Sequence, residues 1–124
     1  MTSLELTKKI VQILDNKKAR EIKAVGIRDL SILADYFIVA TGTSTTQVRA
    51  LGNEVEFQLK NQYDIVPGHT EGYTSNQWVL LDYGHVILHV FGEETREFYD
   101  LERLWKDGEQ VDVAALLEPE ESAE

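Results

Sequence analysis

The sequence predicts an α/β protein of the α+β two-layer sandwich kind, with a mixed four- or five-stranded sheet and helices mainly on one face. Segments with the apolar period of helices are interspersed with short strand-like segments, in the order helix, strand, strand, helix, strand, strand, helix. One strand segment is a near-continuous apolar run, which is expected of a central strand covered on both faces, or nearly so. The 124 residues suffice for one domain with a single core.

The chain is expected to begin with a helix at residues 2–19. Thr2 and Glu5 have the spacing of a capping box, and apolar residues then recur on one helix face. Residues 20–27 suit a strand that follows this helix. Residues 34–42 form the near-continuous apolar run and predict the central strand.

A second helix is expected at about residues 45–61. Ser44 and Gln47 again have capping-box spacing, and apolar residues follow at helical intervals. Strand, glycine-containing turn and helix in this order form an α/β unit in which the helix packs back on the sheet. The expected role of Ser44 is therefore to cap this helix rather than to act as a nucleophile.

The second half of the chain predicts a loop, a hairpin and a helix. Residues 63–77 contain Pro and Gly as loop signals, with room for a short edge strand near Ile65 and Val66. Residues 78–90 have the alternation of a β-hairpin. Residues 93–105 follow with apolar side chains at helical spacing.

The chain is expected to divide into a folded domain at residues 1–110 and an acidic tail at residues 111–124. Residues 111–117 could add a last helical turn. Residues 118–124 have no apolar anchor, so the tail is expected to be partly disordered.

Composition restricts the classes of function. The chain has no cysteine, which excludes disulfides and thiolate chemistry, and no apolar run approaches the roughly 20 residues of a membrane helix. The charged N-terminus lacks the apolar stretch of a signal peptide, and a start at Met1 favours a bacterial cytoplasm. We therefore expect a cytoplasmic protein without a membrane partner.

The net charge of −10 is unevenly distributed. Residues 1–30 carry seven Lys/Arg against four Asp/Glu, residues 31–92 carry two against six, and residues 93–124 carry three against twelve. This acidity opposes direct, phosphate-led binding of nucleic acid, so little direct nucleic-acid contact is expected. It suits either a basic protein partner or a protein that is simply kept soluble by its charge.

The hairpin separates its side chains by parity into two sets. A two-residue turn at Tyr83-Gly84 would pair Asp82 with His85 and Trp78 with His89. The aliphatic set then forms a core face of Val79, Leu81, Val86, Leu88 and Val90. The mixed set, called the hairpin face below, consists of Trp78, Leu80, Asp82, His85, Ile87, His89 and Phe91.

Aromatic and aliphatic groups interspersed with His and Asp are typical of a recognition surface, in which aromatic residues anchor and polar groups orient. The alternative is that a helix of the same chain covers the hairpin face. A third hypothesis uses this face for self-association, so the protein is expected to be a monomer or a homodimer.

No metal, cofactor or catalytic site is predicted. His69, His85 and His89 lack the spacing of metal ligands. A glycine- and serine-containing turn that opens a helix after a strand is also how nucleotidyltransferases hold a triphosphate, but those enzymes need two alternating carboxylates for magnesium. Here only Asp82 stands at such a place, with Leu80 two residues before it. A divergent nucleotidyltransferase-fold enzyme is kept as the alternative function.

Three blocks closely resemble the ribosomal silencing factor (Iojap) family. They are "DYFIVATGTS" (35–44), "WVLLDYGHVILHVF" (78–91) and "ETREFYDLERLW" (94–105), within a resemblance that spans roughly residues 5–107. His85 departs from the pattern, since the family usually has aspartate there. The tail after about residue 110 lies outside the resemblance.

The resemblance implies a nucleotidyltransferase-like fold without catalysis. It also implies that the protein binds the large ribosomal subunit through its fourteenth ribosomal protein, blocks joining of the small subunit, and represses translation under nutrient limitation. Trp78 would be the central anchor on that partner, and Arg96 could pair with an acidic group there. The other expected contacts are Leu80, Asp82, His89, Phe91 and Tyr99.

Overall fold

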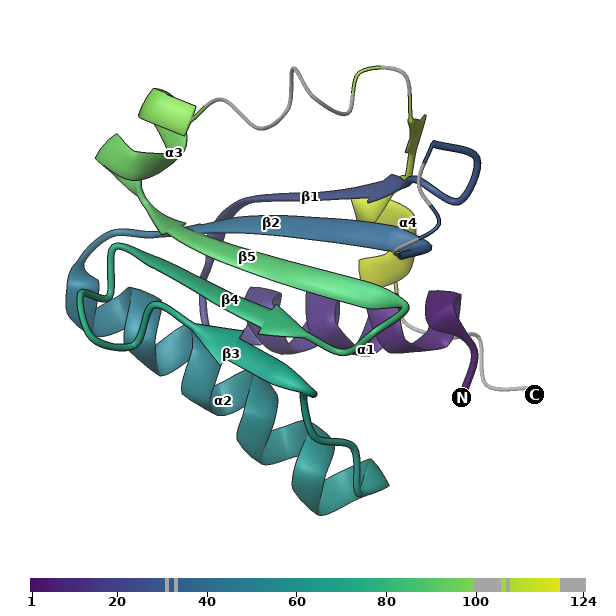
Figure 1. Cartoon of the computed structure of the whole chain (residues 1–124), viewed down its shortest axis with the longest axis horizontal. Helices are drawn as coiled ribbons and strands as arrows, with labels where there is room; N and C mark the ends of the chain where they lie inside the picture. Colours follow the sequence, from purple (N-terminus) through teal and green to yellow (C-terminus); the bar gives the residue numbers. More distant parts are fainter. Residues whose placement is uncertain (31, 33, 100–105, 107, 119–124) are drawn as a thin grey trace.

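The structure is a computed structural model that describes residues 1–30, 32, 34–99, 106 and 108–118. The described residues form one mixed sheet of six strands in the order β3-β4-β5-β2-β1-β6 (Figure 1). β2 and β5 are parallel, and the other neighbours are antiparallel. Along the chain the elements are α1 (Ser3–Asn16), β1 (Arg20–Gly26), β2 (Tyr36–Gly42), α2 (Thr45–Tyr63), β3 (His69–Glu71), β4 (Trp78–Asp82), β5 (Val86–Gly92), α3 (Glu93–Tyr99), β6 (Glu109–Gln110) and α4 (Val113–Leu117).

The two long helices begin where the sequence predicts. Thr2 and Glu5 form the expected reciprocal capping box at the start of α1. Ser44 caps α2 by accepting a hydrogen bond from the backbone N–H of Gln47 at 3.1 Å. The Gln47 side chain accepts from the N–H of Thr43 instead of that of Ser44, so the predicted reciprocal bond is displaced by one residue.

The core lies between the sheet and a layer formed by α1, α2 and α4 (Figure 1). The predicted aliphatic core face is confirmed, because all five of its side chains are fully buried there. A second, smaller apolar cluster lies on the opposite sheet face and contains Val25, Ile27, Ala34, Val39 and Phe91, with Phe37, Trp78 and Ile87 packed against it. The hairpin face therefore belongs to the sheet side opposite the helical layer.

The predicted register of the hairpin is wrong by two residues. Trp78 pairs with Phe91 rather than with His89. The N–H of Tyr83 donates to the carbonyl of Val86 at 3.0 Å, so the two-residue turn is Gly84-His85. Gly84 has φ +89, as a turn with glycine in its first central position requires. Because side chains alternate with a period of two, this shift leaves the core face unchanged and removes only His85, which lies in the turn, from the hairpin face.

The sheet has six strands rather than the predicted four or five. β3 lies at His69–Glu71 instead of near Ile65 and Val66. Asp64 has a left-handed conformation (φ 56) and ends α2. The N–H of Ile65 then donates to the carbonyl of Leu59 in the last turn of the helix. β3 and β6 are short and wholly exposed, so no apolar pattern marks them, and pairing with neighbours gives them strand conformation.

The predicted boundary at residue 110 lies inside the folded part. Residues 113–117 form α4, in which Val113, Leu116 and Leu117 are partly buried and pack against the core. Gln12 of α1 donates a hydrogen bond to the carbonyl of Leu116 at 3.4 Å. Residues 119–124 lie outside the described part. The helix predicted at 93–105 is described as α3 up to Tyr99. No helix among the described residues is long and apolar enough to cross a membrane.

Candidate partner-binding site

Trp78 stands at the centre of an aromatic cluster on the hairpin face. Its indole N–H donates a hydrogen bond to Nδ1 of His89 at 3.0 Å. Its ring centroid lies 4.9 Å from that of Phe91 and 5.8 Å from that of His89. The ring of Phe37 lies edge-on to that of His89, with 5.5 Å between the two centroids. These contacts hold the half-buried indole in one orientation, which reduces the entropy lost when a partner binds it.

His89 positions Trp78 rather than supplying charge. Its side chain is only 7% exposed, and this burial lowers its pKa to about 4, so the imidazole is neutral at pH 7. Nδ1 accepts from Trp78, which places the ring proton on Nε2. The predicted direct contact of His89 with a partner is thus limited to a small exposed edge.

The neutrality of His89 gives a test by pH. In the unfolded chain histidine has a pKa of about 6.5, so below that value the unfolded state binds a proton that the folded state does not. We expect this residue to lower the free energy of unfolding by about 2 kcal/mol between pH ~7.5 and pH ~5. Carboxyl groups with a lowered pKa, such as that of Asp35, lose their stabilising effect only as the pH falls below this window.

The variant His89→Asn removes the titrating group and keeps an acceptor oxygen near the position of Nδ1. Urea unfolding at several pH values across this window should show a clearly shallower loss of stability in the variant than in the wild type. Equal slopes in the two proteins would contradict a buried neutral histidine.

Two predicted contact residues lie inside the protein. Phe91 is completely buried beneath Trp78. Arg96 is 7% exposed; its Nη1 donates to the hydroxyl of Thr41 at 2.8 Å and to the carbonyl of Glu21, whose carboxylate lies 3.8 Å away. Arg96 therefore ties α3 to β1 and β2 and does not offer its charge to a partner, contrary to the prediction. The remaining predicted contact, Tyr99, ends α3, and its side chain lies outside the described part.

The rim of the hairpin face contains ionisable residues that the sequence pattern did not reveal. β3 places Glu71 opposite Leu80 and His69 opposite Asp82, on the same side of the sheet as Trp78. Leu80 and Asp82 are half-buried, whereas both β3 residues are exposed. The Asp82 carboxylate accepts from the N–H of Gly84 at 2.8 Å and so also shapes the hairpin turn. The apolar centre is thus bordered by acidic groups on its outer edge.

Phe37 was also missed as a member of this site. The apolar run that contains it predicts a strand covered on both faces, or nearly so, and Phe37 is half-buried and lies beside Ile87 on β5. The pairing of β2 with β5 puts Phe37 on the same sheet side as Ile87, so alternation along β2 would have placed it in this site. The residues of β3 had no such signal, because the strand itself was not predicted.

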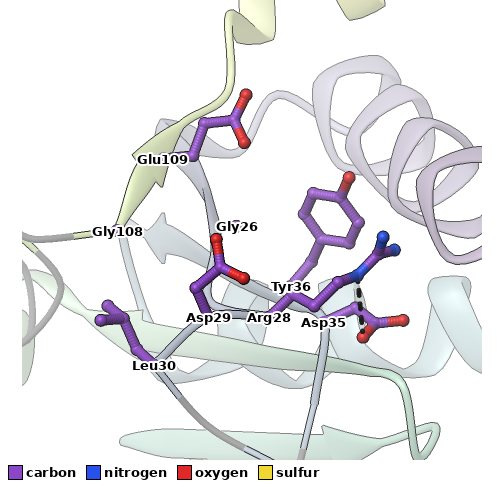
Figure 2. A pocket seen from close by; sticks show the side chains of 8 residues that line it. All are labelled: Gly26, Arg28, Asp29, Leu30, Asp35, Tyr36, Gly108 and Glu109. Carbon is purple, nitrogen blue, oxygen red and sulfur yellow. Dashed lines mark ion pairs between the residues drawn. The ribbon is translucent and has the colours of Figure 1, made fainter.

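A separate pocket of about 450 Å³ lies at the Tyr36 end of β2, whereas Trp78 lies toward the Thr41 end (Figure 2). Arg28 contacts the Asp35 carboxylate at 3.5 Å, and the hydroxyl of Ser3 donates to the same carboxylate at 2.6 Å. The Ser3 hydrogen bond is the main reason that the pKa of Asp35 is lowered. The charges of Arg28 and Asp35 in this pocket are thus paired within the chain. The described residues contain no group of three His, Cys, Asp or Glu side chains suited to a metal ion.

Comparison with known proteins gives a consistent result. A ribosomal silencing factor of Halalkalibacterium halodurans is 34% identical over 117 residues, covering 94% of this chain and 99% of the relative. A crystal structure of a protein from Chromobacterium violaceum has a TM-score of 0.82 and 37% identity, and covers 86% of this chain and 88% of its own. A mouse protein named for mitochondrial assembly of the ribosomal large subunit is 30% identical over 119 residues, with 90% of this chain and 52% of the relative covered.

The sequence resemblance is thereby confirmed and extended. Residues 1–124 match the family described as "Ribosomal silencing factor during starvation", so the match includes the tail that the resemblance left out. The fold agrees as well, since the solved relative superimposes over most of its length. The chain belongs to the family of ribosomal silencing factors.

Proposed function

We propose that the protein binds the large ribosomal subunit through its hairpin face and thereby blocks joining of the small subunit. The observation that carries this proposal is the half-buried Trp78, held by His89 and Phe91 on the sheet side opposite the helical layer. An aromatic side chain oriented in advance within a partly apolar surface is typical of a binding hot spot. Steric blocking requires occupancy of a surface and no chemical step.

The family resemblance favours the fourteenth ribosomal protein of the large subunit as the partner, with repression of translation under nutrient limitation as the result. The acidic groups at the rim, Glu71 and Asp82, suit a partner surface with basic residues around an apolar contact. Electrostatic steering of this kind would raise the association rate at low salt and lose its effect as salt is added. We place this action in the cytoplasm. The nucleotidyltransferase-like character of the fold stays a prediction.

Separated ribosomal subunits test the proposal. After incubation with the protein, sedimentation through sucrose gradients should find it with large subunits and not with small ones. Light scattering should show that large subunits preincubated with saturating protein join small subunits to a much smaller extent. Binding to small subunits alone, or normal joining at full occupancy of large subunits, would contradict the proposal.

The partner itself is tested with the isolated fourteenth ribosomal protein. We expect direct binding by isothermal titration calorimetry, weakened by added salt. Binding to intact large subunits without any binding to the isolated protein would place the contact elsewhere on the subunit.

A further inference from the structure

The segment that leads into Trp78 is fastened to the helical layer by Tyr73. Residues 72–77 connect β3 to β4 and run beside α2 (Figure 1). The Tyr73 hydroxyl donates a hydrogen bond to the Glu56 carboxylate. The Tyr73 carbonyl accepts from Nη1 of Arg49 at 3.0 Å, and the guanidinium lies 5.7 Å from the centroid of the tyrosine ring. One tyrosine is therefore bound to α2 through its hydroxyl, its ring and its backbone.

Gly52 makes room for this tyrosine in the middle of α2. A Cβ added to Gly52 would lie 2.7 Å from the Tyr73 hydroxyl and 3.1 Å from Cγ1 of Val79. Glycine is unfavourable inside a helix, so its presence here fits the close approach of the tyrosine. Arg49, Gly52 and Glu56 are spaced by three and four residues and thus share one side of the helix. This side of α2 contacts both the connecting segment and the start of β4.

The fastened segment fixes the backbone from which the Trp78 side chain projects. Gly72, the residue before the tyrosine, packs so close to Trp78 that an added Cβ would lie 1.7 Å from its carbonyl oxygen. At the other end of the segment the Gln77 carbonyl accepts from the N–H of Gly92 in β5 at 3.0 Å. Trp78 therefore follows a segment that is held at one end by α2 and at the other by β5.

Tyr73 lies on the side of the sheet that a partner on the hairpin face does not reach. It packs against the main core on the helical side, whereas Trp78 packs against the smaller cluster on the opposite side. Burial and the hydrogen bond to Glu56 raise the pKa of Tyr73, so the hydroxyl keeps its proton at neutral pH. We therefore expect Tyr73 to influence binding only through the position of Trp78.

We propose that Tyr73 is a positioning residue for partner binding, which holds residues 72–77 on α2 so that Trp78 is presented in one orientation. This inference rests on the proposed function, in which Trp78 is the anchor. A fixed backbone limits the orientations of the indole before binding and so reduces the entropy lost when the partner binds. Loss of the contacts to α2 should mainly shorten the lifetime of the complex, since most changes in an interface act on dissociation.

The first test observes Trp78 in the free protein. In a nitrogen–proton correlation NMR spectrum, its indole N–H signal is identified by its absence in Trp78→Phe. Tyr73→Ala should shift this signal and speed its exchange with water, because the hydrogen bond to His89 is loosened. Tyr63→Ala removes an exposed tyrosine at the last residue of the same helix and should leave the signal in place.

The second test measures affinity for large ribosomal subunits by co-sedimentation. Tyr73→Ala should weaken binding roughly three- to tenfold, whereas Tyr63→Ala should not change it. In the Trp78→Ala background, Tyr73→Ala should cause no further loss, because no indole is left to position. A residue that only stabilised the fold would have the same effect in both backgrounds.

Tyr73→Phe loses only the hydroxyl and keeps the ring against Gly52, so it should retain the fold. It should move the indole signal in the same direction and weaken binding about twofold. An unmoved indole signal in folded Tyr73→Phe and Tyr73→Ala, or an equal loss of affinity with and without Trp78, would overturn the proposal. A wild-type protein that does not bind large subunits would instead contradict the proposed function, and the indole signal would still show whether Tyr73 positions Trp78.

Discussion

Trp78→Ala is expected to weaken binding to large ribosomal subunits by at least about 30-fold while the chain stays folded. The indole is the largest side chain on the hairpin face that is both accessible and fixed by its neighbours. Its removal deletes the anchor and exposes Phe91, which alone is too deeply placed to replace it. The measurement is co-sedimentation with large subunits at a series of protein concentrations.

Two variants make this result specific. Phe57→Ala removes an aromatic side chain that is 61% exposed on the opposite side of the sheet, and it should leave subunit binding unchanged. Trp78→Phe keeps an aromatic ring over Phe91 but loses the hydrogen bond to His89, so an intermediate affinity is expected. Circular dichroism and thermal melts establish that each variant is folded at the temperature of the binding assay. Wild-type binding by folded Trp78→Ala would remove the hairpin face from the proposed function.

The largest effect on stability is expected from Gly72→Ala. Gly72 has φ +94, and a Cβ added to it would lie 1.7 Å from the carbonyl oxygen of Trp78, a backbone atom that cannot turn aside. Gly84 has a similar φ of +89 but nothing within 4 Å of an added Cβ. Both substitutions carry the cost of a left-handed conformation, about 1 kcal/mol or somewhat more, and only the first adds a clash.

We therefore expect Gly72→Ala to lower the free energy of unfolding by at least about 3 kcal/mol more than Gly84→Ala does. Urea unfolding of the three proteins measures this difference directly, and the melting temperature of Gly72→Ala should be roughly 10 °C below that of Gly84→Ala. Subunit binding should also suffer in Gly72→Ala, because the displaced backbone is that of Trp78. Equal destabilisation by the two substitutions would show that Gly72 does not lie as close to the backbone of Trp78 in β4 as described.

The parts of the fold that the sequence predicts are those with a strong local pattern. The long helices have caps and apolar periods, and the alternation along β4 and β5 separates a core face from a mixed one. That separation survived a two-residue error in register, because parity and not pairing decides which face a side chain takes. Trp78 could accordingly be placed on the correct side of the sheet before any pairing was known.

Burial within the site could not be predicted in the same way. Parity places Phe91 and His89 beside Trp78, but whether each is accessible depends on neighbours that are distant in sequence, such as Phe37. Arg96 was expected to pair with an acidic group on a partner only because the family resemblance implied that contact. Its actual partners, Thr41 and Glu21, lie on strands more than fifty residues earlier in the chain.

By itself the sequence determined the α/β class, the two long helices, the two sides of the hairpin and, through its motifs, the family. These features arise from local periodicity and caps, which act over a few residues. The tertiary structure alone decided that β3 and β6 exist, that Glu71 and His69 border the site, and that Arg96 is used internally. Each of those depends on contacts between segments far apart in the chain, and the chemistry of a short exposed segment does not specify them.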